Sequence, residues 1–520
     1  MSDGTPVVVV GAGPAGVTAA LALRERGVPV HLVEAGERGV VLPPRGEYLE
    51  LRHADRDQWR WLLGAGGEAL DAPANASPKL RVPGLRPVFE GFAQANRIDA
   101  VEGFHVVGAL SPGGLSNAWG CGVAAFLPHE LGVLDDVRDD LAASYERVGH
   151  RVGLSGASDD ALKDYFGVDG FSGPALPLDA LHARLFARCE RLKGRLRLGR
   201  ARVAVLGESR PGRAACDQSG LCLWGCPGRA TWSAALDLQA LAADPGVTLE
   251  LGACVDNLRS DGEGGWWLSV RGRDGMRQQR ARRVLLAAGT LATTRLAWEA
   301  MSERPAELAL QSNPMAAFLL TLPRFFGAAR APAFGLAQLS FTLDRGDAGP
   351  AFGNLFSTHG LPVSEFLRHL PISRSAGLPL LRALLPATIV GNVFLPGDLS
   401  RHRLQLGDDG RMRVIPGQSP HVPVAFQDVR RQLVSGMRKL GAWMLPGSFV
   451  VGAEGADLHY AATLPHARLP APHECHLNGQ VAGLPGIHVV DGASLPQLPA
   501  KAHTLTLMAN ADRIARNLPA

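Results

Sequence analysis

The sequence predicts an α/β protein in two parts, one built on a parallel sheet and a second, α+β part built on an antiparallel sheet. Three observations predict it. A β-branched run at residues 6–10 leads into a glycine-rich turn and a helical pattern. A buried strand pattern at residues 284–290 again leads into a helical pattern. Between residues 305 and 450, aromatic and β-branched runs instead alternate with turn signals, which is typical of antiparallel strands.

The composition is that of an ordinary folded protein. The chain has 520 residues, of which 46% are apolar and 20% are charged, and this excludes extended disorder. A formal net charge of +4 is too small to create a nucleic-acid-binding surface, so we expect no nucleic-acid partner. Seven cysteines disfavour a disulfide framework, and the N-terminus lacks the cationic region of a secretory signal. We therefore expect a cytoplasmic protein.

Residues 6–34 predict a βαβ unit. The run at 6–10 is of the kind that a buried parallel strand requires, and residues 17–26 have a helical pattern. Residues 28–33 predict the second strand, which leads directly into Glu34. An acid at this distance from the glycine-rich turn completes the arrangement that binds a dinucleotide.

Each glycine of the turn has its own task. Gly11 permits the tight turn, Gly13 allows the backbone to approach a pyrophosphate, and Gly16 allows close packing of helix on strand. The phosphate charge would rest on the helix N-terminus, and Glu34 would accept hydrogen bonds from a ribose. The acid at this position argues against a 2′-phosphate and therefore against NADP. The unit predicts an adenine-dinucleotide site.

The remaining elements of this domain are spread along the chain. Residues 40–100 show little periodicity, and no role is assigned to them. Residues 113–120 combine glycines with small polar side chains, a backbone suited to close approach to a ligand. Further elements are predicted at 134–148 (helix), 284–290 (strand), 291–301 (helix) and 487–493 (strand into a turn). The Rossmann-like domain is therefore predicted to be discontinuous, with residues 1–304 and 451–520 flanking a substrate-binding domain at 305–450.

The second domain carries its own signals. Residues 335–343 predict a strand and residues 407–410 a turn. Residues 366–385 are apolar with interspersed arginines, a pattern that occurs at membrane surfaces but more often covers a substrate cavity. We favour the cavity and expect no membrane contact. The longest lipid-like stretch, 383–397, is too short to span a bilayer.

Separated segments resemble the glucose-methanol-choline (GMC) oxidoreductases, flavoproteins that oxidise alcohols. The glycine turn with Glu34 resembles the family's FAD-binding start, and residues 113–120 and 288–290 resemble two further signatures. The C-terminal block is the most specific, with His459-Tyr-Ala-Ala-Thr463, Val490-Asp-Gly-Ala-Ser494 and Lys501-Ala-His503-Thr504. The block departs from the family at Ala462, where the family prefers Gly, and at residues 464–466, which replace a small residue and Met.

The resemblance implies FAD as cofactor and assigns roles to individual residues. The implied cofactor-binding residues are Gly11, Gly13, Gly16, Glu34, Gly114, Ser116, Asn117, Val255, Ala288, Asp491, Gly492 and Thr504. His459 is the implied base, and His503 orients the alcohol oxygen while a hydride passes to N5 of the flavin, although two imidazoles can exchange these roles. Histidine suits this chemistry, because its unperturbed pKa near 6.5 lies close to operating pH.

Metal binding is weighed for two groups of residues. His466, His473, His476 and His488 crowd one region, but their spacing matches no zinc pattern, and we expect no metal there. Cys216, Cys222 and Cys226, followed by Pro227, resemble iron–sulfur ligation. Some membrane-linked sugar dehydrogenases similar to the family carry a three-iron cluster on a comparable spacing. Three small thiols can also simply pack, and both alternatives stay open.

The sequence thus predicts FAD-dependent oxidation of a primary or secondary alcohol to a carbonyl. The substrate is expected to be a medium-sized, partly apolar alcohol, and the electron acceptor is oxygen or an unidentified redox partner. A flavin-bearing lyase without net redox change and a nucleotide-binding module with a structural flavin are the alternatives. An NAD-dependent dehydrogenase is disfavoured, because the glycine fingerprint alone does not explain the C-terminal block.

Overall fold

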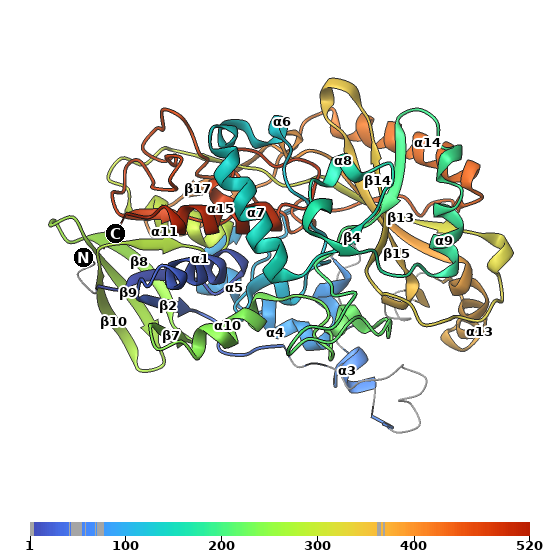
Figure 1. Cartoon of the computed structure of the whole chain (residues 1–520), viewed down its shortest axis with the longest axis horizontal. Coiled ribbons are helices and arrows are strands. Elements are labelled where there is room, and N and C mark those ends of the chain that lie inside the picture. The colour runs from blue at the N-terminus through green and yellow to red at the C-terminus, as the bar shows by residue number, and fades with distance from the viewer. Residues whose placement is uncertain are drawn as a thin grey trace.

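The structure is a computed structural model that describes residues 5–40, 42, 55–57, 59–67, 69, 77–360, 366–367 and 370–519. Parts of the 40–100 segment and of the 366–385 segment therefore lie outside the described residues. Figure 1 shows an elongated molecule with a parallel sheet toward one end and an antiparallel sheet toward the other. The mixed α/β fold class predicted from the sequence is confirmed.

The first part is organised by a five-stranded parallel sheet. Its strand order is β21-β11-β1-β2-β7, with bounds Ile487–Val489, Val284–Leu286, Val7–Val10, Val30–Glu34 and Val247–Leu251. β1 is buried along its whole length, as a β-branched run between two covered faces requires. The C-terminal strand β21 pairs in register with β11, so the segment after residue 451 completes the sheet that the N-terminus begins.

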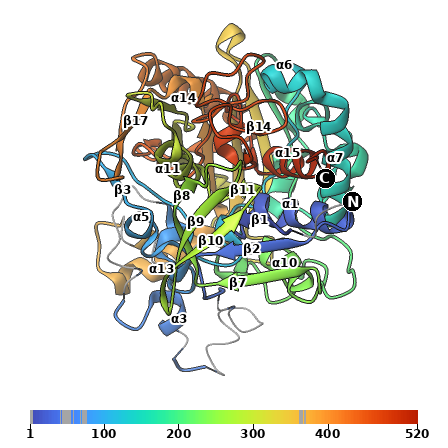
Figure 2. The ribbon, with the colours of Figure 1, turned by 90° about the vertical axis from the view of Figure 1, so that its left-hand side faces the viewer.

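Helices cover this sheet. α1 (Pro14–Glu25) starts at a proline, whose fixed φ suits the first helical turn. It packs against α15 (Thr504–Arg516), and α15 packs against α7 (Arg138–Val152), as the three labelled helices show in Figures 1 and 2. The helix predicted at 134–148 is α7, which starts at Arg138 after a 3₁₀ turn. α11 (Thr290–Ala300) follows β11 as predicted.

The second part is a seven-stranded antiparallel sheet. Its strands are β6 (Leu196–Arg200), β13 (Met315–Thr321), β14 (Ala337–Leu343), β15 (Ala351–Ser357), β16 (Thr388–Phe394), β19 (Trp443–Met444) and β20 (Val450–Val451). The amphipathic helix α14 (Val422–Leu440) packs Val429 and Leu433 into the same core as Phe341 and Val393. β6 comes from outside residues 305–450, and the domain division at 304 and 451 stays a prediction.

Smaller sheets complete the molecule. The turn predicted at 407–410 joins β17 (His402–Leu406) to β18 (Met412–Ile415), which lie with β12 (Leu308–Leu310) and β3 (Ile98–Ala100) in a sheet of their own. The other elements are β4 (Ser155–Ala157), β5 (Gly173–Pro174), β8 (Cys254–Ser260), β9 (Trp266–Gly272), β10 (Gly275–Ala281), α3 (Trp59–Leu63), α4 (Arg86–Phe89), α5 (Phe92–Ala95), α6 (Pro128–Leu131), α8 (Lys163–Phe166), α9 (Ala180–Phe186), α10 (Ala234–Ala242) and α13 (Arg374–Leu384).

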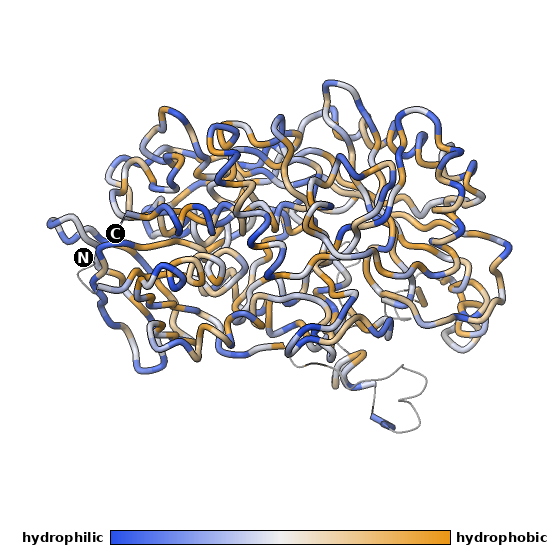
Figure 3. Tube along the Cα trace, viewed as in Figure 1, coloured by the Kyte–Doolittle hydropathy of each residue, from blue (hydrophilic) through white to orange (hydrophobic). Residues whose placement is uncertain are grey.

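Hydrophobic residues follow the strands through the interior of both parts, as the orange segments of Figure 3 show. Core clusters fill the space on either face of the parallel sheet, and a further one lies between the antiparallel sheet and α14. Among the described residues, no helix has both the length and the apolar content that crossing a bilayer demands. The predicted cover over a substrate cavity corresponds to α13, whose Leu381 and Leu384 line the cavity described next.

Candidate active site

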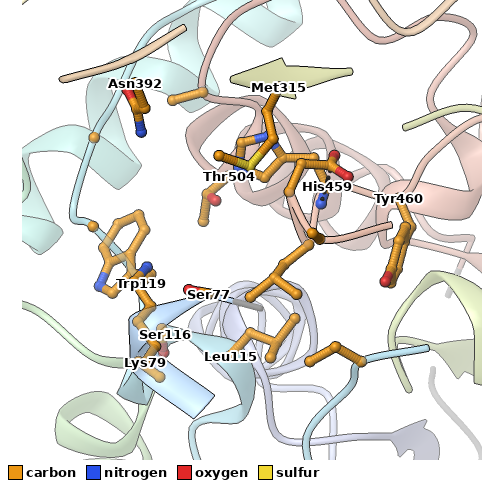
Figure 4. Close-up of a pocket in the computed structure, with 18 of the residues that line it drawn as sticks. Ser77, Lys79, Leu115, Ser116, Trp119, Met315, Asn392, His459, Tyr460 and Thr504 are labelled. Atoms are coloured by element: carbon orange, nitrogen blue, oxygen red, sulfur yellow. Dashed lines mark hydrogen bonds between the residues drawn. The ribbon is translucent and has the colours of Figure 1, made fainter. Parts of the chain in front are cut away.

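A cavity of about 1050 Å³ lies where the two sheets meet. One wall is made by the glycine turn after β1 and by residues 113–120, and another by apolar side chains of the antiparallel sheet, among them Phe352 and Phe394. Figure 4 shows how side chains from distant segments converge on it. Twelve of the predicted site residues line the cavity: Gly11, Gly13, Glu34, Gly114, Ser116, Val255, Ala288, His459, Asp491, Gly492, His503 and Thr504. Gly16 and Asn117 do not line it.

The glycine turn is tightly packed. Gly11 has a φ of +101°, and a Cβ there would lie 2.4 Å from the carbonyl oxygen of Ala287. A Cβ on Gly16 would lie 1.9 Å from the carbonyl oxygen of Gly11, so Gly16 acts by letting α1 pack closely. Gly13 is the N-cap of α1 and has no side chain to satisfy the first backbone N–H groups. Those donors are left for an anionic ligand in the cavity.

Glu34 lies at the end of β2 in the cavity wall. Its two carboxylate oxygens accept hydrogen bonds from the backbone N–H groups of Ala12 and Gly36, each at 2.7 Å. Burial raises the pKa of this carboxyl to about 7, against the lowering effect of the two hydrogen bonds. Each oxygen keeps a lone pair, so the group can still accept from a ribose hydroxyl.

The second glycine-rich loop lies directly on the first. Gly114 has a φ of +58°, and a Cβ there would be 2.9 Å from the Cα of Gly13. The side chain of Asn117 donates to the carbonyl of Pro112 at 2.9 Å and accepts from the hydroxyl of Ser233 at 2.6 Å. Asn117 therefore fixes the loop to the start of α10 rather than facing the cavity.

Asp491 lies just after β21, lines the cavity, and hydrogen-bonds to residues that follow β11. One of its oxygens accepts from the backbone N–H of Gly289 at 2.9 Å and from the hydroxyl of Thr293 at 2.6 Å. The other accepts from the backbone N–H of Ala493 at 3.0 Å. Burial raises the pKa of this carboxyl to about 6. Much of its hydrogen-bonding capacity is thus used within the protein.

The two predicted catalytic histidines lie beside each other. The ring centroids of His459 and His503 are 5.1 Å apart, with the rings at 77°, and Phe394 lies 5.1 Å from the His459 ring. Burial lowers the pKa of His503 to about 4. Burial holds the pKa of His459 well below its usual value, followed by repulsion from the protonated form of His503 and from the Lys79 charge. Both imidazoles are therefore neutral at neutral pH.

The hydrogen bonds of Asn313 define the tautomer of His459. The Nδ2 group of Asn313 donates to the carbonyls of Leu395 and Pro499, at 2.9 and 3.1 Å. Its Oδ1 must then be the atom 3.1 Å from Nδ1 of His459, and because an amide oxygen only accepts, that nitrogen carries the proton. The lone pair of His459 is consequently on Nε2, the nitrogen that can act as a base.

Backbone contacts hold His459 in place. Oδ2 of the buried Asp457 accepts from the backbone N–H of Asn313 at 2.8 Å and of His459 at 3.1 Å. Burial raises the pKa of Asp457 to about 7. Leu458 and Ala462 both have positive φ values, +63° and +61°. The GMC oxidoreductases that the sequence resembles prefer glycine at position 462. Ala462 adopts the left-handed backbone there, which costs free energy for a residue with a side chain.

Sequence reasoning missed three residues at this site. Asn313 and Asp457 carry no motif, and Lys79 belongs to the segment to which no role was assigned. A proline directly after Asn313 was the only local signal, and it indicates extended backbone rather than function. Their place at the site follows from contacts between segments far apart in the sequence.

The cysteine and histidine groups that raised a metal hypothesis have structural contacts. Within the described ranges, no group of three or more histidine, cysteine or acidic side chains is arranged to hold a metal ion. Cys216, Cys222 and Cys226 pack against the first hydrophobic core, which is the packing alternative. The ring of His466 lies between the carbonyl of His476 and the side-chain amide of Asn510, at 2.8 and 3.0 Å.

Comparisons with known proteins agree with this geometry. Residues 4–55 match the family model described as an FAD binding domain. The chain superimposes on the crystal structure of pyridoxine 4-oxidase from Mesorbium loti, a GMC-family oxidoreductase, with a TM-score of 0.64 and 17% identity over 99% of each chain. The chain has the fold of a GMC flavoprotein. No curated protein matches the sequence.

The GMC fold confirms the resemblance inferred from the motifs, and the family model confirms FAD as the cofactor. The residues that line the cavity also fit this cofactor, because the two glycine loops leave no room for Cβ atoms at its wall and the start of α1 offers backbone donors to phosphates.

Proposed function

We propose that this chain oxidises a primary or secondary alcohol to a carbonyl, with His459 as the general base. The observation that carries the proposal is the hydrogen bond from Nδ1 of His459 to Oδ1 of Asn313. It leaves the lone pair on Nε2 of an imidazole that is neutral at neutral pH. A base must be unprotonated before it can take a proton, so this is the state that the reaction requires.

Other residues of the cavity would bind the cofactor and orient the alcohol. The glycine turns, Glu34 and the start of α1 would hold the nucleotide part of FAD, with Ser116, Val255, Ala288 and the 491–492 turn beside it. FAD, when bound, supplies the acceptor for the hydride that leaves the alcohol carbon. Nε2 of His459 takes the hydroxyl proton, so that the C–O bond becomes a carbonyl. His503 holds the alcohol oxygen, and in the reversed assignment the two imidazoles exchange these tasks.

The substrate side of the cavity supports an alcohol with an apolar body. Its lining is mostly aromatic and aliphatic, with Phe352, Phe356, Phe394 and Val390 from the antiparallel sheet. Asn354 and Asn392 are the amides on this wall, and they hydrogen-bond to each other at 3.3 Å. Such a surface binds by excluding water from apolar groups and leaves orientation to few polar contacts.

The test is an anaerobic titration of the flavin absorbance with a panel of aliphatic, aromatic and sugar-derived alcohols. We expect at least one alcohol to bleach the flavin, and His459→Ala to slow bleaching by about 10² to 10⁴ while keeping FAD bound. His476→Ala, at an exposed histidine, is the matched control and should behave as wild type. Bound flavin that no alcohol reduces would contradict the proposal and favour the lyase or the structural-flavin alternative.

A further inference from the structure

Lys79 places an amine in the cavity wall. It lies in a 3₁₀ turn (Pro78–Arg81), lines the cavity, and is labelled in Figure 4. A Cβ added to Gly120 would lie 4.0 Å from its Nζ, so the amine is next to the second glycine-rich loop. Its charge also contributes to the lowered pKa of His459. The amine of Lys79 and the imidazole of His459 therefore line the same cavity.

Among the described residues, no acid lies beside the amine of Lys79, in contrast to Arg202 and Lys501 of the same cavity. Arg202 pairs with Asp160 and Asp169 at 2.9 and 2.6 Å, and Lys501 pairs with Glu130 at 2.6 Å. Within the part of the chain that the structure describes, the side-chain amine of Lys79 has neither a hydrogen-bond nor an ion-pair partner.

Burial lowers the pKa of the Lys79 amine to about 8, against the raising effect of Cys121. At pH 7 the amine still carries its charge for most of the time. Placing such a charge in a largely apolar cavity costs free energy unless a partner of opposite charge is supplied. Lys79 is partly exposed and lines the cavity, so a ligand bound there can supply the partner.

We propose that Lys79 binds a carboxylate or similar anionic oxygen on the substrate, so that the preferred alcohol has an apolar body and one anionic group. This rests on the proposed function and names the substrate class. The hydroxyl is held at the two histidines, the apolar body lies on the aromatic wall, and the anionic oxygen pairs with the amine. A bound anion also stabilises the charged form of Lys79 and is in turn held by it.

The binding test uses the FAD-loaded protein and 4-methylbenzoate, which has the anionic group but no hydroxyl to oxidise. Calorimetry should show binding to wild type that weakens as the pH rises above about 8, where the amine loses its proton. Lys79→Met keeps the aliphatic stem and should weaken binding by about 10- to 100-fold, the usual value of a hydrogen bond to a charged group. Lys79→Arg should retain part of the affinity.

Two controls make the result specific. Lys439→Met, at an exposed lysine of α14, should bind as wild type. Toluene, which lacks the anionic group, should bind wild type and Lys79→Met equally. Equal binding of 4-methylbenzoate to wild type and Lys79→Met would overturn the proposal. Loss of FAD from Lys79→Met would overturn it as well, because the amine would then serve the cofactor.

A second measurement separates this proposal from the proposed function. 4-(Hydroxymethyl)benzoate and its methyl ester are compared as reductants of the flavin under anaerobic conditions. We expect the acid to reduce wild type with the lower half-saturating concentration, and this preference to vanish in Lys79→Met. If neither alcohol reduces the flavin while 4-methylbenzoate binding still depends on Lys79, alcohol oxidation fails and the Lys79 site stands. If both reduce it equally well, alcohol oxidation stands and the Lys79 site fails.

Discussion

The side-chain oxygen of Asn313 lies 3.1 Å from Nδ1 of His459, although the two residues are 146 positions apart. Asn313 comes just before β13 of the antiparallel sheet, whereas His459 belongs to the C-terminal segment that returns to the parallel sheet. The proposed base is thus oriented by a residue from the other part of the molecule. Any change that shifts the two sheets relative to each other also shifts the imidazole.

Replacing Asn313 should impair catalysis without removing a reacting group. In Asn313→Ala the buried Nδ1–H of His459 loses its acceptor, a loss of about 1–3 kcal/mol, so kcat/KM should fall by about 10- to 100-fold. In Asn313→Asp the carboxylate stabilises the imidazolium, and the acid limb of kcat/KM should move to higher pH than in wild type. A pH–rate profile of both variants checks this. An unmoved acid limb in Asn313→Asp would mean that residue 313 supports only the fold.

Gly114→Ala should cost the protein its FAD. A Cβ at this position would lie 2.9 Å from the Cα of Gly13, which would push the two glycine loops apart. Gly346→Ala is the matched control, because Gly346 also has a positive φ, +66°, but has free space where the Cβ would be. Both variants should lose about 1–2 kcal/mol of stability from the left-handed backbone. The flavin-to-protein absorbance ratio should fall only in Gly114→Ala. An unchanged ratio would contradict a role of the two packed glycine loops in binding FAD.

Ala462→Gly should stabilise the protein. Ala462 is buried with a φ of +61°, a conformation that costs an L-residue about 1–2 kcal/mol and glycine almost nothing. Part of the gain is offset by the greater freedom of glycine in the unfolded chain. We expect a net gain of up to about 1 kcal/mol in denaturant unfolding. Ala461→Gly, at the neighbouring buried residue without a positive φ, should instead destabilise the protein.

Asp457→Asn should remove part of the pH dependence of stability. The folded-state pKa of Asp457 is raised from 3.8 to about 7 by burial, so its contribution to stability is present below pH 4 and is lost as the pH rises through 7. Asparagine can keep both backbone hydrogen bonds, since one oxygen of Asp457 accepts them both.

The free energy of unfolding measured at two pH values tests this. At pH 3.5 the variant and wild type should be nearly equal, because Asp457 is then mostly protonated in both the folded and the unfolded protein. At pH 8 the variant should be more stable, by up to about 4 kcal/mol for a shift of three pKa units. A variant less stable than wild type at pH 8 would show that the ionised carboxylate is compensated in the folded protein.

Much of the nucleotide-binding part could be predicted because its constraints are local. The run of valines at β1, the proline that starts α1 and the glycines at positions 11 and 16 each act through neighbouring backbone. The strand at β21 was also predicted from its pattern, whereas its place beside β11 comes from the structure. Asn117 shows the limit of such reasoning, since a motif position predicted to bind the cofactor bonds within the protein instead.

By itself, the sequence determined the parallel and antiparallel sheets, the glycine turns and the pair of histidines, because β-branched runs, glycine conformations and short motifs are properties of adjacent residues. The tertiary structure alone decided which nitrogen of His459 carries its proton and that, among the described residues, no acid pairs with the amine of Lys79. Both depend on Asn313 and Lys79 meeting segments that are more than a hundred residues away in the sequence. Burial and the pairing of charges arise only when those segments pack together.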